Sequence, residues 1–197
     1  MHRHVPQRPT LAIMVKAPVA GRSKTRLGRE IGMVPAAWWA RHQLARLART
    51  LPDPRWRTIL AVAPDRAVLH TGLPALPRLA QGQGDLGDRM ARVFRTFAGP
   101  TLIVGADVPG ITRAHIAAGF AALGSHDAVL GPAEDGGYWA IGLKRTRPLP
   151  PRLFDDVRWS TAHALSDTLA TLPDLRVAFL PRLHDIDTVA DLDRVSP

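Results

Sequence analysis

The chain has 197 residues, a length that fits one domain with its own hydrophobic core. It contains no cysteine, which excludes disulfides, thiolate zinc sites and cysteine nucleophiles. Its 26 Lys and Arg residues outnumber 17 Asp and Glu residues, so the formal net charge is +9. This excess predicts an anionic partner, either nucleic acid or the phosphates of a nucleotide, although an Arg-rich composition alone produces the same total.

The two ends of the chain suggest a simple organisation. Residues 1–9 are expected to form a flexible N-terminal tail, and residues 10–197 a single domain. No apolar run approaches the roughly 20 residues of a membrane span. The charged start lacks the apolar region of a signal peptide. We therefore expect a cytoplasmic protein that does not bind a membrane.

Short strands are expected to alternate with helices along the chain. Apolar runs predict strands, in order, at residues 10–15, 57–63, 101–104, 127–130, 138–143 and 175–180. Helical periodicity predicts helices at 35–50, from Asp85 to Phe97, at 112–123 and at 160–172, followed by a short C-terminal helix. This alternation predicts an α/β fold, with a mostly parallel sheet between helices on both faces. In such folds ligands bind at the carboxyl ends of the strands.

A basic loop follows the first expected strand, from Lys16 to Leu27. It carries four Lys or Arg side chains, small residues and Gly21, so its backbone and its charges can both approach a phosphate. Its Gly–Lys spacing differs from that of a Walker A loop. An ordinary solvated loop is the alternative, but four cations on a short loop repel one another without an anion. The loop therefore predicts a nucleotide-binding site.

Asp107 follows the strand at 101–104, in the run Gly105-Ala106-Asp107-Val108-Pro109. A carboxylate at this position can hold Mg²⁺ or Mn²⁺ against phosphate oxygens, or can simply shape a turn. Asp187, in Asp185-Ile186-Asp187-Thr188, is a candidate second metal ligand or a helix cap.

Two glycine-containing turns complete the candidate site. Asp135-Gly136-Gly137 separates two expected strands, so it is either a hairpin turn or part of a binding site. The run Gln83-Gly84-Asp85-Leu86-Gly87 is either a ligand-binding turn or a capped helix start.

Taken together, these motifs resemble a bacterial family of candidate glycosyltransferases, formerly a domain of unknown function, with some members linked to arsenosugar biosynthesis. The resemblance spans about residues 10 to 194. It rests on six ordered motifs, which begin at Lys16, Gln83, Gly105, Gly131, Trp159 and Asp185. It implies a GT-A fold, the Rossmann-like architecture of the nucleotide-diphospho-sugar transferases.

The resemblance also implies roles for these residues. Lys24, Asp107 and Asp135 would be catalytic. A nucleotide or nucleotide-sugar would be bound by Lys16, Ala17, Gly21, Lys24, Thr25, Arg26, Gln83 and Asp85. A small-molecule acceptor would be bound by Gly136, Gly137 and Tyr138, and Mg²⁺ or Mn²⁺ by Asp107 and Asp187.

Two other functions stay open. Glycosyltransferases of this fold usually carry an Asp-x-Asp motif, whereas here Val108 and Pro109 follow Asp107. Nucleotidyl transfer, as in phospholactate guanylyltransferase, is therefore the alternative to glycosyl transfer. A nucleic-acid-binding module is the rival from another class, and it predicts basic residues spread over one broad face.

Overall fold

A computed structural model describes residues 8–184, 186, 188 and 191. Most of the expected N-terminal tail, the expected C-terminal helix and the candidate metal ligand Asp187 lie outside the described residues. The strands are β1 (Thr10–Lys16), β2 (Arg57–Ala63), β3 (Arg78–Ala80), β4 (Thr101–Gly105), β5 (Ala128–Pro132), β6 (Tyr138–Leu143) and β7 (Val177–Phe179). The helices are α1 (Thr25–Ile31), α2 (Met33–Thr50), α3 (Leu86–Thr96), α4 (Arg113–Ser125) and α5 (Ala164–Ala170), with a 3-10 turn η1 (Asp65–Leu69).

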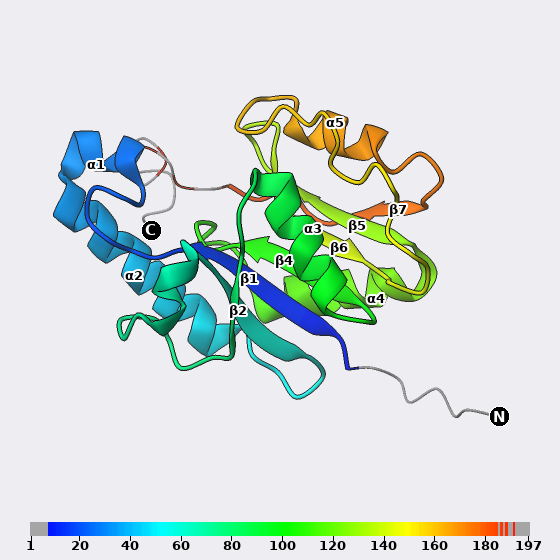
Figure 1. The fold of residues 1–197 in the computed structure, drawn as a ribbon, viewed down its shortest axis with the longest axis horizontal. Helices are drawn as coiled ribbons and strands as arrows, with labels where there is room; N and C mark the ends of the chain where they lie inside the picture. The colour runs from blue at the N-terminus through cyan, green and yellow to red at the C-terminus, as the bar shows by residue number, and fades with distance from the viewer. Residues whose placement is uncertain (1–7, 185, 187, 189–190, 192–197) are drawn as a thin grey trace.

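The strands form one sheet in the order β3-β2-β1-β4-β6-β5-β7 (Figure 1). Only β6 runs antiparallel to its neighbours, which confirms the expected mixed, mostly parallel sheet. In the register, Lys16 at the end of β1 pairs with Ala63 at the end of β2, and Met14 pairs with Gly105 at the end of β4. These strands therefore end at one edge of the sheet, on either side of the point where the strand order reverses, which is where such folds bind ligands.

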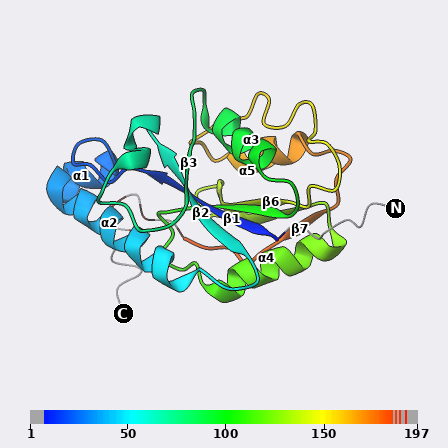
Figure 2. The ribbon, with the colours of Figure 1, turned by 60° about the horizontal axis from the view of Figure 1, so that its bottom comes forward.

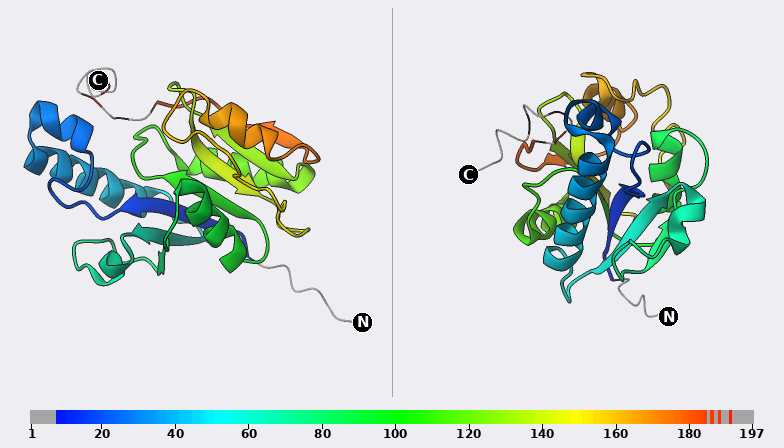
Figure 3. Two further views of the ribbon diagram at one scale, coloured as in Figure 1. Left: turned by 45° about the horizontal axis from the view of Figure 1, so that its top comes forward. Right: turned by 90° about the vertical axis from the view of Figure 1, so that its left-hand side faces the viewer.

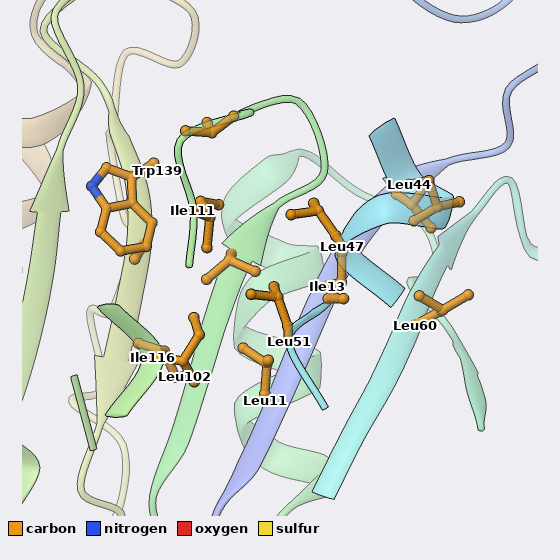
Figure 4. Close-up of a cluster of buried hydrophobic side chains, with 14 of the residues drawn as sticks. Leu11, Ile13, Leu44, Leu47, Leu51, Leu60, Leu102, Ile111, Ile116 and Trp139 are labelled. Carbon is orange, nitrogen blue, oxygen red and sulfur yellow. The ribbon is translucent and has the colours of Figure 1, made fainter. Parts of the chain in front are cut away.

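Helices cover both faces of the sheet, as Figure 2 shows, with α2 and α4 on one face and α3 and α5 on the other. Because side chains alternate along a strand, β1 supplies both cores. Its Leu11 and Ile13 pack with α2 and α4, whereas Ala12 packs with α3. Figure 4 shows the first of these cores, with leucines of α2 over β1 and β2. The continuous apolar run of β1 thus reflects burial on both sides.

Helix α1 is a departure from the sequence prediction, which kept residues 16–27 as a loop. The helix begins within the basic loop, so Thr25 and Arg26 lie in its first turn. It has only seven residues, too few for a readable periodicity, and it is stabilised by packing. Its Leu27 is fully buried with Ala36 of α2 and with Ile186. Figure 3 shows α1 and the start of α2 extending beyond the edge of the sheet.

The sequence pattern also fails to reveal β3 and η1, and it overestimates the length of α5. Strand β3 has three residues and η1 has five, which is below the length at which a sequence pattern is visible. Helix α5 is shorter than the expected 160–172 because turns occupy 159–163 and Ser160 adopts a left-handed backbone, with φ of 60°. No helix in the described part of the chain is long and apolar enough to cross a membrane.

Candidate active site

A cleft of about 1360 Å³ opens at the carboxyl ends of β1, β2 and β4. The loops that follow these strands line it, together with the turn between β5 and β6 and the segment before α5. It brings together most of the residues that the sequence marked: Lys16, Ala17, Gly21, Lys24, Thr25, Arg26, Gln83, Asp107, Asp135, Gly137 and Tyr138. Asp85 and Gly136 are not among the lining residues. Motifs far apart in sequence therefore share one cavity.

The charges along the cleft favour an anion. Among the described residues, six Lys and Arg side chains line it, against three aspartates. The cations are Lys16, Arg22, Lys24, Arg26, Arg66 and Arg89, and the anions are Asp65, Asp107 and Asp135. A concave, mostly basic surface with low-dielectric walls concentrates anionic ligands. The cleft is therefore suited to phosphates, with carboxylates available for a cation or a proton.

The basic loop is a tight turn that leads from β1 into α1. The Ala17 amide donates to the Ala63 carbonyl at 2.8 Å, which extends the pairing of β1 with β2. The amides of Arg22 and Ser23 both donate to the Val19 carbonyl. Gly21 has φ of 74°, and a Cβ added there would meet no atom within 4 Å, so its backbone angle, and not crowding, requires glycine. The turn leaves the residue Arg22 exposed at the mouth of the cleft.

Lys24 is more buried than the other basic residues of the loop. Its ammonium donates to Asp107 Oδ2 at 2.8 Å and to the Ile186 carbonyl at 2.7 Å. It also lies 5.9 Å from the centre of the Trp39 ring. Its side chain is only 12% exposed, whereas Lys16 and Arg26 are exposed residues. A charge this buried requires strong partners, and the structure provides them.

Asp107 lines the cleft just after β4, next to Lys24 of the basic loop. Its carboxylate is 42% exposed, and one of its oxygens accepts from Lys24. A Cβ added at Gly105 would lie 2.8 Å from Asp107 Oδ1, so the glycine leaves room for the carboxylate. The Asp107 carbonyl accepts from the Ile186 amide at 3.2 Å. The residue therefore joins the end of β4 to the chain near the C-terminus.

The turn after β3 is held in place by side chains that the sequence pattern did not reveal. Buried Gln81 donates through Nε2 to the Val15 carbonyl at 3.2 Å and to the Ala61 carbonyl at 2.8 Å. The Gly82 amide donates to Asp65 at 2.8 Å. Arg92 of α3 donates to the carbonyls of Gln81 and Gln83. A single uncharged Gln beside a three-residue strand carries no readable signal, so it was missed.

Both carboxylate oxygens of Asp85 accept hydrogen bonds from the protein itself. Its Oδ1 accepts from the Asp88 amide at 2.9 Å, while the Asp88 carboxylate accepts from the Asp85 amide at 3.1 Å. This reciprocal capping box begins α3, as the sequence predicted for a helix cap. Its Oδ2 accepts from the Trp159 indole N–H at 3.1 Å. The bond joins the turn after β3 to the segment before α5.

The turn at Asp135-Gly136-Gly137 joins β5 to β6, as expected of a hairpin. Asp135 is exposed, and its Oδ1 accepts from the Gly137 amide at 2.8 Å. Gly136 has φ of 84°, and a Cβ there would lie 2.4 Å from the Ala162 carbonyl oxygen. Only glycine fits so close to the segment before α5. The turn therefore presents a carboxylate to the cleft from a tightly packed support.

Tyr138 contributes its ring to the cleft but not a free hydroxyl. The Thr168 hydroxyl donates to the Tyr138 oxygen at 3.3 Å, and the phenol is held near Met90 of α3. Burial raises the pKa of Tyr138 well above that of a free tyrosine. Its ring packs at an edge against Trp159, with 6.5 Å between the ring centres. Any contact of Tyr138 with a ligand would therefore be apolar.

The cleft offers few protein ligands for a divalent cation. Among the described residues no group of three or more His, Asp or Glu side chains could hold a metal ion. Mg²⁺ commonly binds through one or two carboxylates together with substrate phosphates, and it keeps several waters. Asp107, half exposed in a basic cleft, fits this mode of binding. Asp187 lies outside the described residues.

Comparison with known proteins gives the family. Residues 46–161 match the model of a family described as uncharacterized proteins conserved in bacteria, DUF2064. The chain belongs to this family. No curated protein matches its sequence. The expected resemblance to a bacterial family of this fold is confirmed.

Solved structures agree with this assignment. A candidate nucleotide-diphospho-sugar transferase from Desulfovibrio desulfuricans G20 is 30% identical, with a TM-score of 0.85 over 94% of this chain and 85% of that one. A CMP:2-keto-3-deoxy-manno-octonic acid synthetase complexed with CTP is 12% identical, with a TM-score of 0.57 over 96% of this chain and 97% of that one. Rv0371c of Mycobacterium tuberculosis H37Rv, in complex with manganese, is 13% identical, with a TM-score of 0.53 over 96% and 98%. The 30% identical relative and the fold of the other two agree with the mixed, mostly parallel sheet described above, and this chain has the Rossmann-like fold of nucleotide-diphospho-sugar transferases and nucleotidyltransferases.

Proposed function

We propose that the protein is a transferase that binds an activated nucleotide in the cleft and passes a group from it to a small-molecule acceptor. The observation that carries this proposal is the convergence of the basic loop after β1, the carboxylate of Asp107 after β4 and the carboxylate of Asp135 on one cavity. Supporting it, a relative 30% identical over 94% of this chain is described as a candidate nucleotide-diphospho-sugar transferase. A neighbour of the same fold binds CTP.

The donor nucleotide would lie against the basic loop. Lys16, Arg22 and Arg26 line the cleft and would contact its phosphates, since an Arg fork and a Lys point charge both suit phosphate oxygens. The bend at Gly21 and the small residue Ala17 would let the backbone come close. Thr25 and Gln83 offer uncharged donors at the edges of the same cavity. Asp85 would act only through the turn that it caps.

The acceptor would lie at the turn between β5 and β6. The exposed Asp135 carboxylate would accept a proton from an attacking hydroxyl or orient it, which is the usual task of a positioned carboxylate. The Gly136-Gly137 backbone would fix the direction of that carboxylate through the bond from the Gly137 amide. The Tyr138 ring would supply an apolar surface. Catalysis would come mainly from positioning and from stabilisation of negative charge.

A divalent cation, Mg²⁺ or Mn²⁺, is part of this proposal. Asp107 would hold it together with substrate phosphates, and Asp187 is the candidate second ligand. When bound, such a cation neutralises charge that builds up on the phosphates. The manganese complex of Rv0371c, a protein of the same fold, is consistent with this assignment. A cytoplasmic location stays a prediction, as does the single-domain division of residues 10–197.

Glycosyl transfer from a nucleotide-diphospho-sugar is the first choice, because the 30% identical relative carries that description. Nucleotidyl transfer is the second. It is favoured by the absence of a second aspartate after Asp107, where Val108 and Pro109 follow, and by the fold shared with a cytidylyl-transferring synthetase. The basic loop suits a triphosphate as well as a diphosphate.

A thermal-shift panel tests the proposal without knowledge of the acceptor. The wild-type protein is heated with each NTP, several nucleotide-sugars or a DNA duplex, with and without Mn²⁺. A ligand at 100 times its Kd adds about 2.7 kcal/mol of stability, which such a scan detects. We expect stabilisation by nucleotide-sugars that increases with Mn²⁺. A response to NTPs alone would favour nucleotidyl transfer, whereas a response to DNA alone would overturn the transferase proposal.

A further inference from the structure

The ammonium of Lys24 is enclosed by groups from three parts of the chain. It donates to Asp107 after β4 at 2.8 Å and to the Ile186 carbonyl near the C-terminus at 2.7 Å. It also lies 5.9 Å from the centre of the Trp39 ring of α2. The side chain is 12% exposed. By contrast, Lys16 on the same loop is an exposed residue that lines the cleft.

The backbone at Lys24 is specialised as well. Its φ of 48° and ψ of 46° lie in the left-handed region, which non-glycine residues seldom occupy, and it stands immediately before α1. Gly21, three residues earlier, bends the loop at φ of 74°. The two bends point the Lys24 side chain inward toward Asp107. A residue whose task was only to reach solvent-exposed phosphates would need neither this backbone nor this burial.

Ile186 links the Lys24 ammonium to Asp107 and to the buried contact between α1 and α2. Its amide donates to the Asp107 carbonyl at 3.2 Å and its carbonyl accepts from Lys24, so both of its backbone polar groups are bound at this point. Its side chain is fully buried against Leu27 of α1 and Ala36 of α2. The start of α1, the end of β4 and the chain at residue 186 therefore meet around one charge.

We propose that Lys24 is a positioning residue that pairs with Asp107 and makes cation binding at Asp107 depend on the bound nucleotide. This inference rests on the proposed function for the role of Asp107. A cation that approaches the carboxylate meets an ammonium already bonded to one of its oxygens, so the two positive charges repel each other. Phosphates from a nucleotide supply the negative charge that offsets this repulsion. Lys24 then acts on phosphates through Asp107, whereas Lys16 contacts them directly.

The test measures two affinities in Lys24→Met and in the matched variant Lys16→Met. Mn²⁺ binding is measured without nucleotide by electron paramagnetic resonance. Nucleotide binding is measured by calorimetry with EDTA and again with saturating Mn²⁺, using the nucleotide that most stabilises the wild-type protein. Because the Mn²⁺ arm uses no nucleotide, it tests Lys24 even if the protein binds none.

For Lys24→Met we expect Mn²⁺ affinity to rise at least about fivefold. Its metal-free nucleotide affinity should fall, because the unpaired Asp107 carboxylate repels phosphates, and should return to within about twofold of wild type when Mn²⁺ is saturating. For Lys16→Met we expect unchanged Mn²⁺ affinity and a loss of nucleotide affinity that Mn²⁺ does not restore. Lys24→Arg keeps the charge and should retain the wild-type Mn²⁺ affinity. Lys24→Gln, which keeps a donor for Ile186, replaces the methionine variant if that one unfolds.

Two results would overturn the inference. If Lys24→Met weakens nucleotide binding at saturating Mn²⁺ as much as Lys16→Met does, Lys24 is a direct phosphate ligand. If the neutral variants leave Mn²⁺ affinity at the wild-type value, the ion pair only stabilises the fold. If the wild-type protein binds no nucleotide at all, the proposed function fails, and the Mn²⁺ result still decides the effect of the Lys24 charge on Asp107.

Discussion

The two walls of the cleft use polar residues in opposite ways. On the basic wall, formed by the loop after β1, Lys16 and Arg22 are exposed and line the cavity, whereas Lys24 is bonded to Asp107. The second wall is formed by the turns after β3 and between β5 and β6 and by the segment before α5. There Asp135 is exposed, but Asp85 caps α3 and accepts from Trp159, and the Tyr138 oxygen accepts from Thr168. The exposed cations are available to a ligand, whereas Asp85 and the Tyr138 hydroxyl hold the shape of the scaffold. The position of a motif beside a cleft is therefore not by itself evidence that its side chains contact a ligand.

The largest effect is expected where the second wall is most tightly packed. Gly136→Ala would place a methyl group 2.4 Å from the Ala162 carbonyl oxygen, at a residue with φ of 84°. Backbone strain and overpacking together predict a loss of about 3 kcal/mol in the free energy of unfolding, or roughly 6–12 °C in Tm. Thermal denaturation measures it. Gly124→Ala is the control, because that helical glycine has no atom within 4 Å of its added Cβ and should not lose stability. Equal melting temperatures for the two variants would contradict the packing described here.

On the basic wall we expect loss of binding without loss of stability. Lys16→Ala removes an exposed cation that lines the cleft. A charged hydrogen bond contributes about 1.5–3 kcal/mol, so nucleotide affinity should fall by about tenfold or more. Calorimetric titration measures this, and the thermal midpoint of the free protein should stay within about 1 °C of wild type. A variant that binds as tightly as wild type would remove Lys16 from the site.

Asp85→Ala should give the opposite result. It removes the capping box of α3 and leaves the Trp159 indole without its acceptor. Loss of such a cap costs about 1–2 kcal/mol of stability. Nucleotide affinity should change less than in Lys16→Ala, since Asp85 does not line the cleft and both of its carboxylate oxygens accept hydrogen bonds from the protein. Denaturant unfolding and calorimetry on the same two variants compare the walls directly. A large loss of affinity with unchanged stability would make Asp85 a ligand-binding residue.

The smallest expected effect is on the free energy of unfolding at acidic pH, and it comes from the ion pair between Arg158 and Asp167 of α5. Arg158, next to Trp159, donates to both carboxylate oxygens of Asp167, and these hydrogen bonds lower the pKa of Asp167 to about 2. An unfolded aspartate has a pKa near 3.9, so the pair stabilises the fold above about pH 4 and loses this contribution as the pH falls toward 2. Asp167→Asn should flatten the stability profile in that window while leaving its shape above pH 5 unchanged. An identical profile for variant and wild type would show that this partly exposed pair contributes nothing measurable.

Much of the fold could be predicted from local pattern. Strands β1, β2 and β4 are apolar runs buried on both faces, and α3 begins at a recognisable cap, so their positions follow from the residues alone. The elements that were missed, α1, β3 and η1, have seven, three and five residues. Their stability comes from tertiary contacts such as Leu27 against Ile186, which no local pattern encodes.

The site was predictable as a set of positions and much less as a set of contacts. Because strands end at one edge, the sequence indicated that Lys16, Asp107 and Asp135 would meet, and the structure brings them to one cleft. It gave no sign that Lys24 bonds to Asp107 and to the Ile186 carbonyl, since these partners lie 83 and 162 residues away. Residue type and spacing identify a basic loop, but the left-handed backbone of Lys24 decides which cation turns inward.

The most direct test of the central claim is a crystal structure of the protein grown with Mn²⁺ and the nucleotide that most raises its Tm. We predict phosphates in contact with Lys16 and Arg26, and an anomalous manganese peak within about 2.2 Å of the Asp107 carboxylate. A nucleotide bound away from the cleft at the ends of β1 and β4, or manganese distant from Asp107, would contradict it.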